Sequence, residues 1–164
     1  MTAASASGGA LPIILAATGL GLLVSAVWAA ALGQTLVACI FGPFSGFWWS
    51  YAVLVLGLCH NWFAIPAGNV THSVALFQIW WAVVMAALTL ATLRLPVAFT
   101  AVVALVVLAL VLLIFGTLNA DETLTKAAGY VTFAFAALGT YLFLGAASAA
   151  TGGKAYPLGR PLVR

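Results

Sequence analysis

Charged side chains are scarce in this chain. Of its 164 residues only 4% are charged, five Lys or Arg and two Asp or Glu, while 66% are hydrophobic. A soluble domain carries about a quarter charged residues, so this chain cannot cover a water-facing surface with polar groups. Its basic residues are not clustered with aromatics as a nucleic-acid interface would need. The partner predicted for its surface is the lipid bilayer, and we expect no nucleic acid.

Groups that carry catalysis or bind metal are equally scarce. Cys39 and Cys59 have no CxxC or Cys/His spacing that would hold a metal, and we interpret both as small core residues. His60 and His72 have no Ser or Cys arranged with them, so we interpret them as ordinary loop residues, with a pH sensor as the alternative. We therefore predict no enzyme, no catalytic residue, no metal site and no cofactor.

Long apolar runs are what the chain does contain. They continue for about twenty residues, which suits helices that cross a bilayer at 1.5 Å per residue and does not suit the alternation of barrel strands. The predicted fold is all-α, a polytopic membrane bundle of about five transmembrane helices. The predicted spans are residues 11–31, 36–58, 74–93, 96–118 and 127–150. The first could instead be a cleaved signal peptide, because small residues follow it, although no Lys or Arg precedes it.

Polar segments between the runs predict the organisation and the orientation. Residues 1–10 form an N-terminal tail, 11–150 the bundle and 151–164 a basic C-terminal tail. Lys and Arg accumulate on the cytoplasmic side of a membrane, and here they follow the third run and fill the tail. The C-terminus is therefore predicted inside and the N-terminus outside. Two connections fall outside: a loop from about 59 to 73 with both histidines, and a polar loop containing Asn119, Asp121, Glu122 and Lys126.

An aromatic stripe marks the second run. Phe41, Phe44, Trp48 and Tyr51 are spaced by three, four and three residues, so they share one helical face beside Pro43. A proline inside a membrane helix predicts a kink. The spacing favours tight packing against other helices or lipid, and the lining of a pore is the alternative. Spacing leaves both interpretations open.

Hydroxyl and amide side chains occur in two further runs. In the last run one face carries Tyr130, Ala134, Ala137, Tyr141 and Ser148. Small residues allow close helix contact, and hydroxyls need partners away from lipid, so this face is expected to look into the protein, toward a solute path or another helix. In the third run Gln78, Thr89 and Thr92 suit hydrogen bonds between helices.

Four motifs resemble the acetate uptake transporter family, which includes the bacterial succinate-acetate permeases. Gly33-Gln34-Thr35-Leu36, followed by Phe41 to Trp48, is similar to that family's Gly-Asn-Thr-Phe and Phe-x-x-Tyr-Gly-x-Phe-Trp with the same spacing. The others are Ala91-Thr92-Leu93-Arg94, Ala128-Gly129-Tyr130 with Tyr141 to Gly145, and Tyr156-Pro157-Leu158-Gly159. The resemblance covers about residues 18–159.

The resemblance implies six spans, homohexamers and a path for small carboxylates in each subunit. It places the family's narrow constriction at Phe44, where the family has tyrosine, and at Val106, where it has leucine. The family's Asn-Pro-Ala-Pro-Leu-Gly motif and the first helix that carries it have no counterpart here. Ala17 to Leu22 also replaces a more polar stretch of the family pattern.

The resulting hypothesis is a membrane transporter or channel for acetate and other small monocarboxylates. Passage would be proton-coupled or would use the neutral acid, because a bare carboxylate in an apolar constriction is costly. The protein would be a multi-pass homo-oligomer, a hexamer by resemblance, in a cell membrane, with the bacterial inner membrane expected. The alternative is a structural or binding membrane subunit that keeps the fold and does not transport. The predicted path residues are Phe41, Phe44, Trp48, Val106, Tyr130 and Tyr141.

Overall fold

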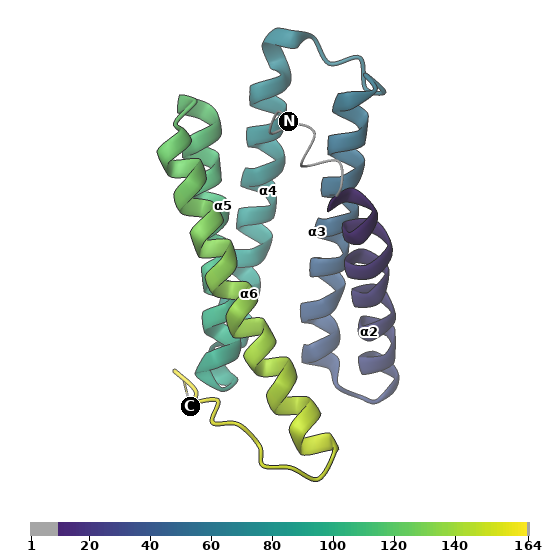
Figure 1. Ribbon diagram of the computed structural model, residues 1–164, viewed down its shortest axis with the longest axis vertical. Coiled ribbons are helices and arrows are strands. Elements are labelled where there is room, and N and C mark those ends of the chain that lie inside the picture. The colour runs from purple at the N-terminus through teal and green to yellow at the C-terminus, as the bar shows by residue number, and fades with distance from the viewer. Residues whose placement is uncertain (1–9, 164) are drawn as a thin grey trace. The chain divides into compact units, whose positions relative to one another are not determined.

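The computed structural model describes residues 10–163, and their regular structure is helical (Figure 1). The chain divides into two compact units, Met1–Ala67 and Gly68–Arg164. Within the described residues the helical elements are η1 (Ile13–Gly19), α2 (Leu20–Ala31), α3 (Thr35–Cys59), η2 (Ala67–Asn69), α4 (Val70–Ala91), η3 (Thr92–Arg94), α5 (Val97–Asn119) and α6 (Glu122–Ala150). The division of the chain into two tails around one bundle stays a prediction.

Five of the helical stretches are long and apolar enough to cross a membrane. They are Ala10–Ala31, Thr35–Cys59, Ala67–Arg94, Val97–Asn119 and Glu122–Ala150. The prediction of an all-helical membrane protein with about five spans is confirmed.

A tight turn joins α2 to α3 in the first unit. The N–H of Gln34 donates to the carbonyl of Ala29, and the N–H of Gly33 donates to that of Ala30. This pair of bonds is the Schellman ending of a helix, which needs a left-handed residue at its turn. Gly33 supplies it with a φ of +73°. The turn lays α2 alongside α3, and α3 continues through Pro43.

A π-helix precedes α2 and is fastened to α3. The seven residues of η1 end at Gly19, whose carbonyl accepts a 2.8 Å hydrogen bond from the buried Ser45 hydroxyl. The indole of Trp49 lies against the Cα of Gly19, so that a methyl group there would overlap the ring. The sequence offered no signal for a π-helix, because apolar content is the same in both helix types.

Close packing of small residues builds the second unit. Helices α4, α5 and α6 follow one another up and down, with α5 contacting both neighbours (Figure 1). Ala98, Ala109 and Gly116 are buried on α5, and Ala128 and Gly145 are buried on α6. Small side chains let membrane helices approach closely, and close approach replaces the hydrophobic effect as their source of stability.

One side-chain hydrogen bond joins the end of α4 to the beginning of α5. The hydroxyl of Thr100 donates to the carbonyl of Thr92 at 2.8 Å, and both residues are buried. This carbonyl lies at the end of α4, where a helix leaves its last carbonyls without partners in the helix. The same carbonyl also accepts the N–H of Leu95 at 2.8 Å, so the Thr100 hydroxyl adds a second hydrogen bond to it and ties the two helices together.

Two helix starts differ from the prediction. Helix α4 begins at Val70, so His72 lies in its first turn and not in a loop. Helix α6 begins at Glu122, because the Asp121 carboxylate accepts from the N–H groups of Thr123 and Leu124 at 2.7 and 3.2 Å. Glu122 and Lys126, predicted in a loop, form an exposed ion pair on α6. Polar residues suit a first helical turn outside the lipid, where hydropathy does not detect them.

Gly19 tests the attachment of η1 to α3. Adding a methyl group there should lower the free energy of unfolding by about 1 to 3 kcal/mol, the usual cost of overpacking. Gly21 is the matched control, because its missing Cβ would meet nothing within 4 Å. Unfolding of Gly19→Ala and Gly21→Ala in mixed micelles should therefore separate them, and equal stability would contradict the Gly19–Trp49 contact.

Candidate functional site

The aromatic stripe of α3 lies beside the face that packs on η1 and α2. Ser45 and Ala52 are the buried residues of that packing face. Phe41, Phe44 and Trp48 are half-buried next to it. The rings of Trp48 and Tyr51 meet edge to face with centroids 6.3 Å apart. The spacing thus predicted a shared face, while the helical face that contacts α2 is set by smaller residues between the aromatics.

A cavity of about 280 Å³ opens where α2 and α3 approach their connecting turn. Phe41 is the predicted path residue that lines it. The other residues that line it include Val24, Ser25, Trp28, Leu32 and Gln34. The Ser25 hydroxyl donates to the carbonyl of Gly21 at 2.8 Å, so only its acceptor capacity faces a solute. The cavity is mostly apolar, with an amide and a hydroxyl at its wall, as small-molecule sites often are.

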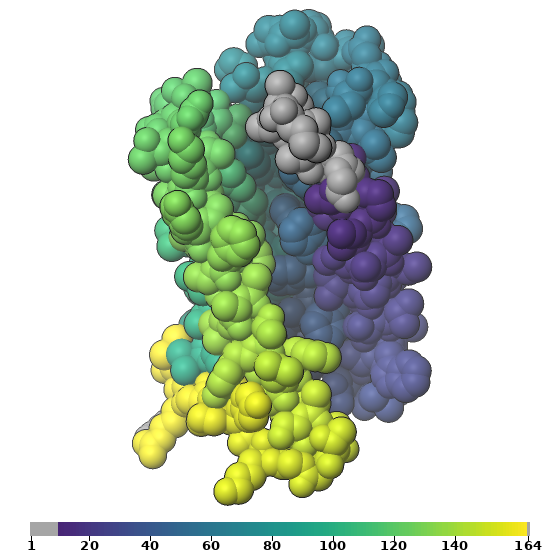
Figure 2. All heavy atoms as spheres, in the orientation of Figure 1, coloured from purple at the N-terminus to yellow at the C-terminus, as the bar shows by residue number. Residues whose placement is uncertain are grey.

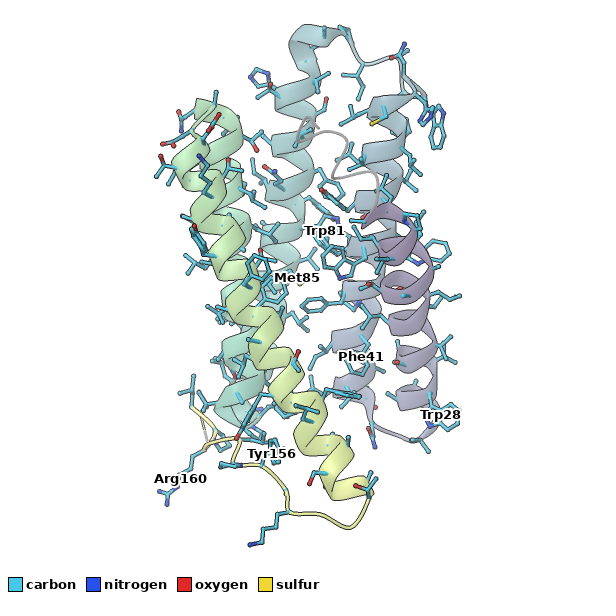
Figure 3. All side chains as sticks on the ribbon, viewed as in Figure 1. Trp28, Phe41, Trp81, Met85, Tyr156 and Arg160 are labelled. Atoms are coloured by element: carbon cyan, nitrogen blue, oxygen red, sulfur yellow. The ribbon has the colours of Figure 1, made fainter. Side chains whose placement is uncertain are left out.

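A second groove on α2 is wholly apolar. It has a volume of about 630 Å³ and is lined by Leu23, Val24, Val27, Trp28, Ala31 and Leu32. In Figure 3 the Trp28 side chain projects from the end of α2 away from α3, and it is 68% exposed. An exposed apolar face with a tryptophan near the helix end is typical of a surface that meets lipid.

The three predicted path residues of the second unit lie in different surroundings. Val106 is buried in α5 with 5% exposure, while Tyr130 on α6 is 75% exposed. The Tyr141 hydroxyl donates to the carbonyl of Pro157 at 2.9 Å. The buried Ala128 lies about 160° around α6 from Tyr130 and marks a different face, while Gly145, one turn after Tyr141, is covered by Tyr156 of the tail. The tyrosine face expected to look inward is therefore not the packing face of α6 within this unit.

The C-terminal tail folds back across one end of the second unit (Figures 1 and 2). The N–H of Ala98 donates to the carbonyl of Leu158 at 3.1 Å, and the N–H of Leu162 donates to that of Leu93 at 3.1 Å. The Ser148 hydroxyl donates to the Lys154 carbonyl at 2.9 Å. The tail is thus bonded both to the α4–α5 connection and to α6.

Tyr156 anchors the tail on α6. Its ring lies 5.2 Å from that of Tyr141, and a side chain at Gly145 would press on its Cβ, 3.0 Å away. Figure 3 shows Tyr156 beneath the helices and Arg160 directed away from them. Gly159 makes the turn between these two residues with a φ of +78°, where a side chain would also overlap Val97. Small residues in the sequence thus leave room for a tyrosine that arrives from the tail.

Hydroxyl groups in the spans are mostly satisfied by their own helices. Thr89 donates to the carbonyl of Met85, and Thr92 to that of Thr89, each at 2.8 Å. The expectation that these hydroxyls bond between helices was wrong, because a carbonyl one turn back is always within reach. Gln78 differs, since its Oε1 is buried and has no hydrogen-bond partner among the described residues. Such a group costs about 1 to 3 kcal/mol.

The Asp, Glu, Lys and Arg side chains of the described residues lie toward the helix ends. In the second unit Arg94 and the tail residues Lys154 and Arg160 lie at one end, and Asp121 and Glu122 lie at the other end of α5. With 1.5 Å per residue, the length of α5 separates the two groups by about 34 Å. Lys126 lies at the same end as Glu122 and pairs with it. A helix bundle whose middle is covered by lipid needs its charges near the ends, and the described residues meet this requirement.

Histidine and cysteine form no metal centre in the part of the chain that the structure describes, where no group of three potential ligands occurs. The ring nitrogen Nδ1 of His60 lies 2.9 Å from the carbonyl of Leu56, and its ring stacks on Trp62. Cys39 and Cys59 are both exposed, so their interpretation as core residues was wrong. Cys39 lies on a face of α3 about 120° from Ser45, whose hydroxyl bonds to Gly19 of η1.

Known proteins were compared with the chain at the level of families, sequences and structures. The family model described as the GPR1/FUN34/yaaH family matches residues 6–158. No curated protein and no solved structure matches the chain.

The tail attachment predicts a difference between two tyrosines of α6. Tyr141→Phe removes the hydroxyl bond to the Pro157 carbonyl and should loosen the tail, so that trypsin cleaves after Lys154 several times faster. Tyr130→Phe is the control, because its side chain is 75% exposed. Equal cleavage rates for wild type and Tyr141→Phe would contradict the anchoring role of this hydroxyl.

Proposed function

The chain belongs to the GPR1/FUN34/yaaH family of acetate transporters, and on that premise we propose that it carries acetate and other small monocarboxylates across a cell membrane. Members of the family are membrane transporters and not enzymes, and the five apolar helices make this chain a multi-pass membrane protein. The match of residues 6–158, nearly the whole chain, is the observation that carries the proposal.

The species that crosses is the neutral acid, or an anion that moves together with a proton. Support comes from the charges of the described residues, which lie toward the helix ends and leave no fixed cation in the middle of a span to balance a carboxylate. An unpaired carboxylate in an apolar passage carries a large desolvation cost. Protonation removes that charge before entry, so a proton is the natural companion of the solute.

The residues proposed for the path are mostly aromatic or apolar, and they are taken in each unit by itself. Phe41 and Phe44 contribute from α3, next to Trp48, and Val106 contributes from α5. On α6 we propose Tyr130, whose hydroxyl is exposed, as a polar group of the path. Tyr141 belongs to the same proposal as the residue that couples the path to the tail through the Pro157 carbonyl.

The assembly and orientation are proposed with the function. We expect homo-oligomers, with a hexamer as the family resemblance implies. The end of the second unit with Arg94 and Lys154 faces the cytoplasm, because basic residues near helix ends are retained on that side. The N-terminus then faces outward if all five helices span the membrane.

Acid dependence tests the transported species. With a carboxyl pKa of about 4.3, about 0.2% of the acid is neutral at pH 7 and about 17% at pH 5. Labelled acetate entry into proteoliposomes, corrected for protein-free vesicles, should therefore rise by up to about eightyfold between these values. Entry that requires the protein but ignores pH would contradict neutral-acid passage. Entry equal to that of empty vesicles would favour a non-transporting membrane subunit.

Phe44 tests the position of the constriction. Phe44→Ala should widen the path and either speed acetate entry or admit larger carboxylates. Phe99→Ala is the matched control, because Phe99 is also half-buried in a helix but has no proposed path role. Truncating a buried Phe costs about 3 to 5 kcal/mol in soluble cores, so size-exclusion profiles must first show that both variants fold. A folded Phe44→Ala protein with unchanged rate and selectivity would assign Phe44 to packing.

A further inference from the structure

Gln78 is a polar residue close to the middle of a membrane span. The span that contains it runs from Ala67 to Arg94, so Gln78 lies about 4 Å along the axis from its midpoint at 1.5 Å per residue. Ala75 and Met85, with 2% and 0% exposure, occupy the same helical face three residues before and seven after it. Its side chain therefore belongs to the buried face of α4.

The carbonyl oxygen of the Gln78 side chain is buried without a hydrogen-bond donor among the described residues. The hydroxyls near it in sequence are committed elsewhere, as Ser73 donates to the Asn69 carbonyl and Thr89 to that of Met85. A buried acceptor without a donor is rare in folded proteins and calls for an explanation. A ligand that brings its own donor would supply one.

We propose that Gln78 binds the protonated form of a small carboxylic acid by pairing its carboxamide with the carboxyl group. The amide carbonyl accepts the O–H of the acid, and the amide N–H donates to the carbonyl of the acid, so two hydrogen bonds form side by side. A carboxylate has no proton to donate, and its negative oxygen would face the amide oxygen. Gln78 therefore selects the neutral acid over its anion.

This inference rests on the proposed function and deepens it, since it names the residue that recognises the protonated solute. Apolar side chains along a path exclude the anion through desolvation alone and do not distinguish a carboxylic acid from another neutral solute of its size. An amide that needs a donor adds that distinction. Solutes that offer an N–H or O–H are favoured over solutes that offer only acceptors.

Three solutes of similar size separate these roles in proteoliposomes. Acetic acid and acetamide both carry a donor and an acceptor, acetamide stays neutral at every working pH, and methyl acetate carries acceptors only. We compare protein-dependent entry for wild type, Gln78→Leu and the control Asn119→Leu, which removes another side-chain carboxamide at the exposed end of α5. Should Gln78→Leu fail to fold by size exclusion, Gln78→Met, which keeps the chain length, takes its place.

The expected result is a selective loss. Gln78→Leu should slow acetic acid and acetamide entry about tenfold and leave methyl acetate unchanged, while Asn119→Leu should match wild type for all three. Unchanged entry of the two donors in a folded Gln78 variant would overturn the inference and leave the proposed function standing. An equal loss for all three solutes would also overturn it, because it would assign Gln78 to packing.

A binding measurement keeps the inference separate from transport. If wild-type protein admits no acetate, the proposed function fails, and saturation-transfer NMR with acetamide in detergent then decides the inference by itself. Acetamide signals that depend on wild-type protein, persist with Asn119→Leu and fall at least severalfold with Gln78→Leu support the site. Signals that are absent for wild type, or unchanged in the Gln78 variant, overturn it.

Discussion

The lipid interior offers no water to polar groups, and the arrangement of the described residues follows from that constraint. Asp, Glu, Lys and Arg side chains lie toward helix ends, and hydroxyls within the spans return to carbonyls of their own helix, as Thr132 and Thr140 do on α6. The Thr92 carbonyl at the end of α4 accepts both the Leu95 N–H and the Thr100 hydroxyl. The buried carbonyl of Gln78 is the exception, and for that reason it carries the inference about solute recognition.

Small residues allow the close packing that stabilises helices in lipid. Gly19 lets the Trp49 indole lie directly on η1, and Gly145 makes room for Tyr156 of the tail. The Tyr156 side chain holds the tail against α6, and the backbone hydrogen bonds of residues 158 to 163 hold it against the α4–α5 connection. The end of the second unit with most of its basic residues is thus also the end that the tail stabilises, which links the predicted cytoplasmic side to a fixed local structure.

Hydropathy predicted the spans well and their starts less well. Apolar runs found α2, α3 and α5 to within a few residues, because lipid selects directly for such runs. The start of α6 depends on two hydrogen bonds to the Asp121 carboxylate. Composition could not predict this start, because a polar loop and a helix cap contain the same types of residue. Spacing placed Phe41 and Trp48 near one face of α3, but the face of α6 that meets α5 was not predictable, since small residues chosen by packing decide it. The π-helical form of η1 left no trace in the sequence.

The central claim is that the solute crosses without net charge, and the response of transport to membrane voltage tests it most directly. Proteoliposomes with a potassium gradient and valinomycin would be set to potentials of either sign at constant pH, and protein-dependent acetate entry would be measured. Moving one charge across 100 mV changes the free energy by about 2.3 kcal/mol, a factor of about fifty in equilibrium distribution. The account predicts equal entry at both potentials, and entry that follows the sign and size of the potential would contradict it.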